Sequence, residues 1–169
     1  MTVRLARPED VSDIVRLVRE LAEYEREPDA VHLTEEVLAD RLFGPSPAVF
    51  AHVAELHGEV VGMAVWFVSF STWTGRHGIW LEDLYVQPAS RGQGLGTMLL
   101  ATLAAVCAAR GYSRLEWTVL DWNDRALGFY RAVGAVGMND WTTQRMQGDT
   151  LAALASQAPS PSELGLSPT

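Results

Sequence analysis

A glycine-rich hexapeptide, Arg91–Gly96, separates an apolar segment of strand length from a long apolar segment of helical length. Glycine lets a backbone approach a ligand closely, and the free amides at the start of a helix attract anions. The pattern predicts a phosphate-binding loop, although the same glycines would also suit a plain structural turn. A Walker loop would continue with lysine, whereas Thr97 and Met98 follow here, and the glycine spacing differs from a Rossmann fingerprint.

The hydrophobic pattern around this loop predicts a single α/β domain. Helices are expected at 10–24, 34–42, 95–110 and 123–133, and strands at 3–5, 48–56, 59–69, 79–86, 114–120 and 136–147. This order of elements favours a mixed sheet with helices on both faces. We expect the domain to span residues 1–157 and the Pro- and Ser-rich residues 158–169 to form a disordered tail.

Composition limits the partners and the compartment. None of the apolar runs approaches the ~20 residues that cross a bilayer, and the first residues do not resemble a secretory signal. The single cysteine, Cys107, excludes an internal disulfide, so we expect a cytoplasmic protein with no membrane partner and no metal site. The formal net charge of −8 argues against nucleic acid and favours a cationic ligand.

Two adjacent acids, Glu82 and Asp83, interrupt the apolar strand expected at 79–86. Alternate strand residues point to opposite faces, so at least one acid should point inward, where burial would raise its pKa. Such a group is a candidate for a base or for the partner of a cation, and a structural ion pair is the plainer alternative. We assign Glu82 to accept a proton from an ammonium group, whose pKa is about 10, and Asp83 to hold the positive charge of the substrate.

Two residues of the helix expected at 123–133 also stand out. Asn123 lies at its start, where capping alone explains an asparagine. Tyr130 lies two turns further on and therefore shares a face with Asn123, although ordinary packing is the common role of a tyrosine on a helix.

Taken together, these segments resemble the GNAT superfamily of N-acetyltransferases. The pattern Arg91-x-x-Gly94-x-Gly96 after Leu84-Tyr85-Val86 is similar to its acetyl-CoA motif, and the element order over residues 1–147 agrees with its fold. That fold is α/β, with a mixed, mostly antiparallel sheet, helices on both faces and a central split between two strands. The resemblance implies acetyl-CoA as co-substrate and implies a set of residues that contact it: Leu84, Tyr85, Val86, Arg91, Gly92, Gln93, Gly94, Leu95, Gly96, Thr97, Asn123 and Ala126. It also implies that Tyr130 protonates the departing thiolate.

Three segments are more specific, namely 20–25 (ELAEYE), 71–76 (STWTGR) and 81–86 (LEDLYV). They resemble the diamine (spermidine/spermine) acetyltransferases, and 71–76 with the LDWN at 120–123 is most similar to the branch that prefers thialysine. This resemblance places a set of residues at the amine substrate: Tyr24, Glu25, Glu82, Asp83 and Trp141. Two features depart from the family: 136–140 is shorter and less acidic than its equivalent, and Val133 replaces a basic residue that helps to hold CoA.

The resemblance therefore implies a homodimeric enzyme that acetylates a primary amine of a polyamine, a diamine or a thialysine-like amino acid. Direct transfer in a ternary complex is expected, because Cys107 lies among apolar residues of a helix and reads as a buried thiol rather than a nucleophile. Two other functions stay open. One is acetylation of a protein lysine or N-terminus, and the other is a non-catalytic acyl-CoA-binding module.

Overall fold

The computed structural model describes residues 1–159, which divide into a first compact unit, Met1–Phe129, and a second one that begins at Tyr130. The expected disordered tail, 158–169, lies outside the described residues except for its first two positions. Its boundary with the domain stays a prediction. In the part of the chain that is described, none of the helices has the length and apolar character needed to cross a membrane.

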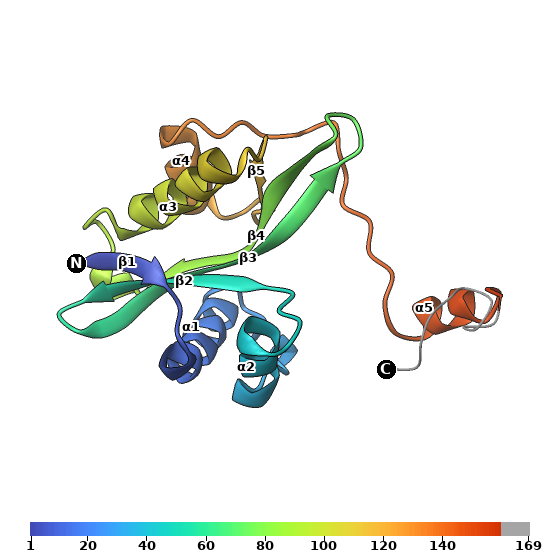
Figure 1. The fold of residues 1–169 in the computed structure, drawn as a ribbon, viewed down its shortest axis with the longest axis horizontal. Helices are drawn as coiled ribbons and strands as arrows, with labels where there is room; N and C mark the ends of the chain where they lie inside the picture. The colour runs from blue at the N-terminus through green and yellow to red at the C-terminus, as the bar shows by residue number, and fades with distance from the viewer. Residues whose placement is uncertain (160–169) are drawn as a thin grey trace. The chain divides into compact units, whose positions relative to one another are not determined.

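A sheet of five strands forms the centre of the first unit (Figure 1). Its spatial order follows the chain: β1 (Thr2–Leu5), β2 (Phe50–Leu56), β3 (Glu59–Ser71), β4 (Arg76–Val86) and β5 (Leu115–Glu116). The first four strands pair antiparallel, and β5 joins β4 in parallel. The turn between β2 and β3 is His57-Gly58, both in the left-handed region with φ of 54° and 87°, as a two-residue hairpin requires.

Helices cover both faces of this sheet (Figure 1). α1 (Val11–Tyr24) and α2 (Glu35–Phe43) lie on one face, and α3 (Leu95–Arg110) lies on the other. Short 3-10 turns occupy Pro8–Asp10, Pro28–Ala30 and Pro88–Ser90. The predicted mixed, mostly antiparallel α/β sheet with helices on both faces is confirmed.

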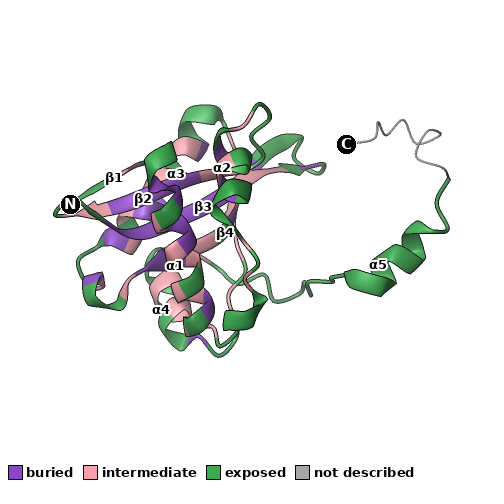
Figure 2. Cartoon of the chain, turned by 90° about the horizontal axis from the view of Figure 1, so that it is seen from below, coloured by how far each residue is buried: buried purple, intermediate pink, exposed green. Residues whose placement is uncertain are grey.

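Apolar residues at helical spacing explain where α1 packs. Ile14 and Leu17 are fully buried and meet Val53 and Met63 of the sheet in one core cluster. The buried residues concentrate in the strands and on the inner sides of the helices (Figure 2). Thr34 caps α2, since its hydroxyl accepts a hydrogen bond from the Val37 amide at 3.3 Å.

Two expectations about the C-terminal half are wrong. The strand expected at 114–120 is only the two residues of β5, because β4 pairs with it at Ile79 and Trp80 alone. The segment expected as a strand at 136–147 has no regular secondary structure. Its large apolar side chains are exposed, and a strand forms only where it finds a pairing edge. The second unit instead contains α5 (Gly148–Ala155), which is exposed along its length, and α4 (Asp124–Ala132) runs across the boundary of the two units.

Candidate active site

One edge of β4 is open where the two acids lie. Because β5 pairs only with Ile79 and Trp80, residues 81–86 have no strand neighbour on that side within the described chain. Such an edge presents unpaired backbone amides and carbonyls that can bond an extended ligand. This is the central split expected from the resemblance. Apart from the Val86 carbonyl, which bonds Arg91, it leaves the backbone groups of 84–86 that face this edge available for the predicted contact with the CoA arm.

A β-bulge lies at the position of the two acids. Asp83 lies opposite Val65, but the next pair along the strand is Leu81 with Trp66, which leaves Glu82 as an extra residue. Bulges re-aim side chains and are common beside active sites. Glu82 is exposed and Asp83 is half-buried, as expected for adjacent strand residues that point to opposite faces.

The acids form an acidic cluster with the end of α1. Burial, followed by the negative charges of Glu82 and Glu25, raises the pKa of Asp83 from its ordinary 3.8 to about 6. Burial also raises the pKa of Glu25. Glu82 accepts a hydrogen bond from the indole nitrogen of Trp80 at 3.0 Å. We call Glu25, Glu82 and Asp83 the acidic cluster, and a bound cation would relieve the repulsion among its members.

The glycine loop leaves its amides accessible. Gly92 and Gly94 have φ of 80° and 83°, and a Cβ added to either would meet no atom within 4 Å, so the loop faces open space. The Met98 amide is the first of α3 to bond back into the helix, to the Gly94 carbonyl at 2.9 Å. The amides of Leu95, Gly96 and Thr97 therefore have no partner within the helix. Such amides at the start of a helix suit an anion. The Leu95 side chain is buried, so only its backbone can contact a ligand there.

Gly96 is explained by packing rather than by its backbone angles. A Cβ at this position would lie 3.3 Å from Cζ of Phe129, a tighter contact than side chains ordinarily make. The glycine therefore lets the Phe129 ring of α4 lie against the first turn of α3.

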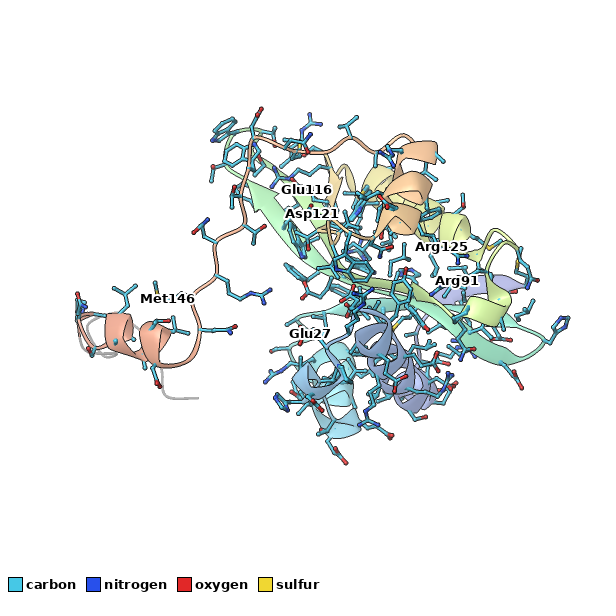
Figure 3. All side chains as sticks on the ribbon, turned by 180° about the vertical axis from the view of Figure 1, so that it is seen from behind. Glu27, Arg91, Glu116, Asp121, Arg125 and Met146 are labelled. Carbon is cyan, nitrogen blue, oxygen red and sulfur yellow. The ribbon has the colours of Figure 1, made fainter. Side chains whose placement is uncertain are left out.

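Arg91, which is labelled in Figure 3, connects the loop to the end of β4 through a hydrogen bond. Its Nε donates to the Val86 carbonyl at 2.7 Å, and its guanidinium carbon lies 5.1 Å and 5.5 Å from the ring centroids of Tyr24 and Tyr85. These cation–π contacts hold the side chain between two rings. They show how Arg91 positions the loop, and its direct contact with acetyl-CoA stays a prediction.

The end of α1 is joined to the start of α4. The Tyr24 hydroxyl donates to Oδ1 of Asn123 at 3.1 Å, and the same oxygen accepts from the Ala126 amide at 3.2 Å. The second bond confirms that Asn123 caps the helix. Because the Ala126 amide is used by the cap, any contact of Ala126 with CoA would have to come from its side chain or carbonyl.

Sequence reasoning missed a cation next to these residues. The guanidinium carbon of Arg26 lies 4.9 Å from the ring centroid of Trp122, and that ring lies 6.2 Å from the Tyr24 ring. Arg26 also has a φ of 67°, which is unusual for a residue other than glycine. The only signal in the sequence was its position directly after Glu25, within reach of the segment that suggested a substrate contact.

The remaining predicted residues are placed as follows. Gln93 and Thr97 are exposed on the loop and on α3. Tyr130 and Trp141 belong to the second unit, where Tyr130 is half-buried near the end of α4 and Trp141 is 67% exposed. The contacts assigned to these four residues stay predictions. No group of His, Cys, Asp or Glu side chains within residues 1–159 is arranged to hold a metal ion.

The free cysteine is unsuited to carry an acetyl group. Cys107 is buried in α3, and its thiol donates to the Arg114 carbonyl at 3.6 Å. Burial raises the pKa of the thiol, so the reactive thiolate is scarce at neutral pH. This agrees with the expectation of a core thiol.

Comparison with known proteins supplies the family. The family model of the acetyltransferase (GNAT) family matches residues 14–135 of the chain. Thialysine N-epsilon-acetyltransferase of Bos taurus is 42% identical over 164 residues, which cover 90% of this chain and 96% of that protein. L-ornithine N5-acetyltransferase of Arabidopsis thaliana is 28% identical over 197 residues, covering 90% and 86%. Among solved structures, an integron cassette protein from the mobile metagenome of V. cholerae superposes with a TM-score of 0.78 at 27% identity, over 92% of this chain and 98% of its own. The chain belongs to the acetyltransferase (GNAT) family.

Proposed function

We propose that this acetyltransferase moves the acetyl group of acetyl-CoA directly to a primary amine of a small cationic acceptor, such as a polyamine, a diamine or a thialysine-like amino acid. The observation that carries the proposal is the acidic cluster at the open edge of β4, next to a loop lined with free amides. The relatives named for acetylating thialysine and ornithine support an amine as acceptor. Homodimerisation and a cytoplasmic location stay predictions.

Acetyl-CoA would bind along the glycine loop and the open strand edge. The free amides at the start of α3 suit its pyrophosphate, since they add the positive end of the helix dipole. The open edge at Leu84–Val86 offers backbone amides to the extended arm and to the thioester carbonyl, whose oxygen gains negative charge during the reaction.

The acceptor would enter as an ammonium ion drawn by the acidic cluster. Asp83 holds the cation, since its burial strengthens the attraction between the two charges. Glu82 is exposed to water and accepts the proton of the reacting ammonium group through a water molecule. The free nitrogen then bonds to the acetyl carbon, the carbon–sulfur bond breaks, and Tyr130 gives its proton to the thiolate of CoA.

Thiol release from acetyl-CoA tests the proposal. The panel contains spermidine, spermine, putrescine, thialysine, lysine and a peptide with one lysine, each with and without enzyme. Saturable release with a small amine, and identification of the N-acetyl product by mass spectrometry, is the expected result. Release with the peptide alone would make the protein a protein acetyltransferase, and tight CoA binding without release would make it a binding module.

A further inference from the structure

We propose that Arg26 binds a carboxylate of the acceptor, so that the site selects the side-chain amines of basic amino acids over amines that carry only positive charge. The inference rests on the proposed function, because it names the class of acceptor for the same site. It adds a residue that determines specificity, at the end of α1.

The Arg26 guanidinium is free to receive an anion. Its side chain is exposed, and none of the ion pairs among the described residues includes it, although Glu25 and Glu27 flank it in the chain. The other cation near the site, Arg91, is already committed to the Val86 carbonyl and to two rings. A guanidinium without an acidic partner beside an acidic cluster is a natural point for a ligand carboxylate.

Trp122 contacts the guanidinium of Arg26. The guanidinium carbon lies 4.9 Å from the centroid of the indole ring, a distance typical of a cation–π contact. A guanidinium that stacks its flat face on a ring keeps its edge free. The edge carries the paired N–H donors that match the two oxygens of a carboxylate.

Arg26 lies at a backbone position where glycine is the more common residue. With a φ of 67°, Arg26 ends α1 in the left-handed conformation, where glycine is the usual residue. The Arg26 amide bonds to the Glu23 carbonyl at 3.2 Å, and the Glu27 amide bonds to the Ala22 carbonyl at 2.9 Å. Any side chain other than glycine costs about 1–2 kcal/mol in this conformation. The strained position projects a cation from the same turn that holds Glu25.

The site is therefore bipolar. Glu25 lies close enough to Asp83 for its charge to raise the pKa of that carboxyl, so the acidic cluster reaches the residue directly before Arg26. A basic amino acid carries an ammonium group at one end and a carboxylate at the other, and it can satisfy both poles. A diamine or polyamine would bring a second cation toward Arg26, and the repulsion would disfavour it.

Two pairs of acceptors that differ by one carboxyl group test the inference, namely ornithine with putrescine and lysine with cadaverine. The readout is the ratio of kcat/KM within each pair for the wild type, Arg26→Ala, Arg26→Lys and a control, Arg41→Ala, which alters an exposed arginine on α2. The wild type and the control should prefer the amino acid. Arg26→Ala should lower the ratio about 10- to 100-fold, the value of a charge-assisted hydrogen bond. The ratio for Arg26→Lys should lie between those of the wild type and Arg26→Ala, because lysine keeps the charge but loses the paired donors.

An unchanged ratio in Arg26→Ala would overturn the inference while leaving acetyl transfer intact. A raised KM for acetyl-CoA with an unchanged ratio would assign the guanidinium to the co-substrate and would also overturn it. Equilibrium binding of the same acceptors to the complex with CoA separates the two proposals. Tighter binding of ornithine than of putrescine, abolished in Arg26→Ala, would support the carboxylate site even if no thiol were released, and the proposed function alone would fail.

Discussion

The Tyr24 hydroxyl donates a hydrogen bond to Oδ1 of Asn123 across 3.1 Å, although the two residues lie 99 positions apart in the chain. The same oxygen accepts from the Ala126 amide and so forms the cap of α4. Tyr24, which is assigned to the acceptor, and Ala126, which is assigned to CoA, therefore both donate hydrogen bonds to Oδ1 of Asn123. Tyr24 stabilises the start of α4 in addition to any contact that it makes with the acceptor.

Removing the hydroxyl alone tests this role. Tyr24→Phe keeps the ring beside Arg91 but loses the hydrogen bond, and it should lower the free energy of unfolding by about 1 kcal/mol. Asn123→Ala should cost more, about 1–2 kcal/mol, because it also loses the cap. Chemical denaturation of the single and double variants gives the coupling energy of the pair. Strictly additive losses would show that the hydrogen bond is not made in solution.

Asp83→Asn should stabilise the fold while it impairs the enzyme. The pKa of Asp83 is about 6 in the folded protein and 3.8 in the ordinary case, so the folded state binds this proton more tightly. Ionising Asp83 therefore costs stability, and the cost grows as the pH rises from 3.8 to 6 and is complete above 6. The amide should raise the free energy of unfolding above pH 6 by about 1–3 kcal/mol, measured by denaturation at several pH values. If the variant and the wild type differed as much in free energy of unfolding below pH 3.8 as above pH 6, the assigned pKa would be contradicted.

The same carboxyl should set the lower limb of the pH profile for the acceptor. Because Asp83 attracts the cation only when ionised, kcat/KM for the acceptor should rise as the pH passes through about 6. Asp83→Asn should lose this limb along with most of the affinity for the acceptor, whereas the KM for acetyl-CoA should stay near the wild-type value. Persistence of the limb in the variant would assign it to another group.

Gly94→Ala tests whether the loop amides hold the co-substrate. The position has a φ of 83° and open space for a methyl group, so the variant suffers backbone strain of about 1–2 kcal/mol without a clash. The strain should displace the amides and raise the KM for acetyl-CoA about tenfold, the value of one bond to a charged group. Gly75→Ala is the matched control, because Gly75 has a φ of 64° and equally open space but lies in the turn between β3 and β4. A similar rise in both variants would attribute the effect to lost stability.

The sequence predicted the elements whose signals are local. α3 begins and ends where expected, because Gly94 and Gly111 bracket an apolar run and Gly111 adopts the left-handed conformation of a glycine that ends a helix. The wrong strand at 136–147 and the shortened β5 depend on pairing with residues distant in the chain, which no local pattern encodes.

The candidate site divides in the same way. The glycine loop and the acid pair were visible as motifs, and the Asn123 cap followed from its position before a helix. The bulge at Glu82 results from the register of β3 against β4, and the Arg26 contact with Trp122 joins two distant segments. Neither could be read from one segment alone.

Tyr130→Phe tests the proposed acid. The variant removes one hydroxyl, so kcat should fall about 100-fold or more, while the KM for acetyl-CoA should change little. Tyr112→Phe is the control, because Tyr112 follows α3 and its ring lies 5.7 Å from that of His77. Equal kcat values in the wild type and in Tyr130→Phe would remove Tyr130 from the mechanism.

The central claim is direct transfer from acetyl-CoA to an amine, and initial rates of thiol release measure it most directly. The concentrations of acetyl-CoA and of the best acceptor in the panel are varied against each other. Direct transfer in a ternary complex predicts double-reciprocal lines that intersect, with the same pattern in Cys107→Ser. Parallel lines would reveal an acetylated enzyme as intermediate, and an absence of release at any concentration of any amine would contradict the account as a whole.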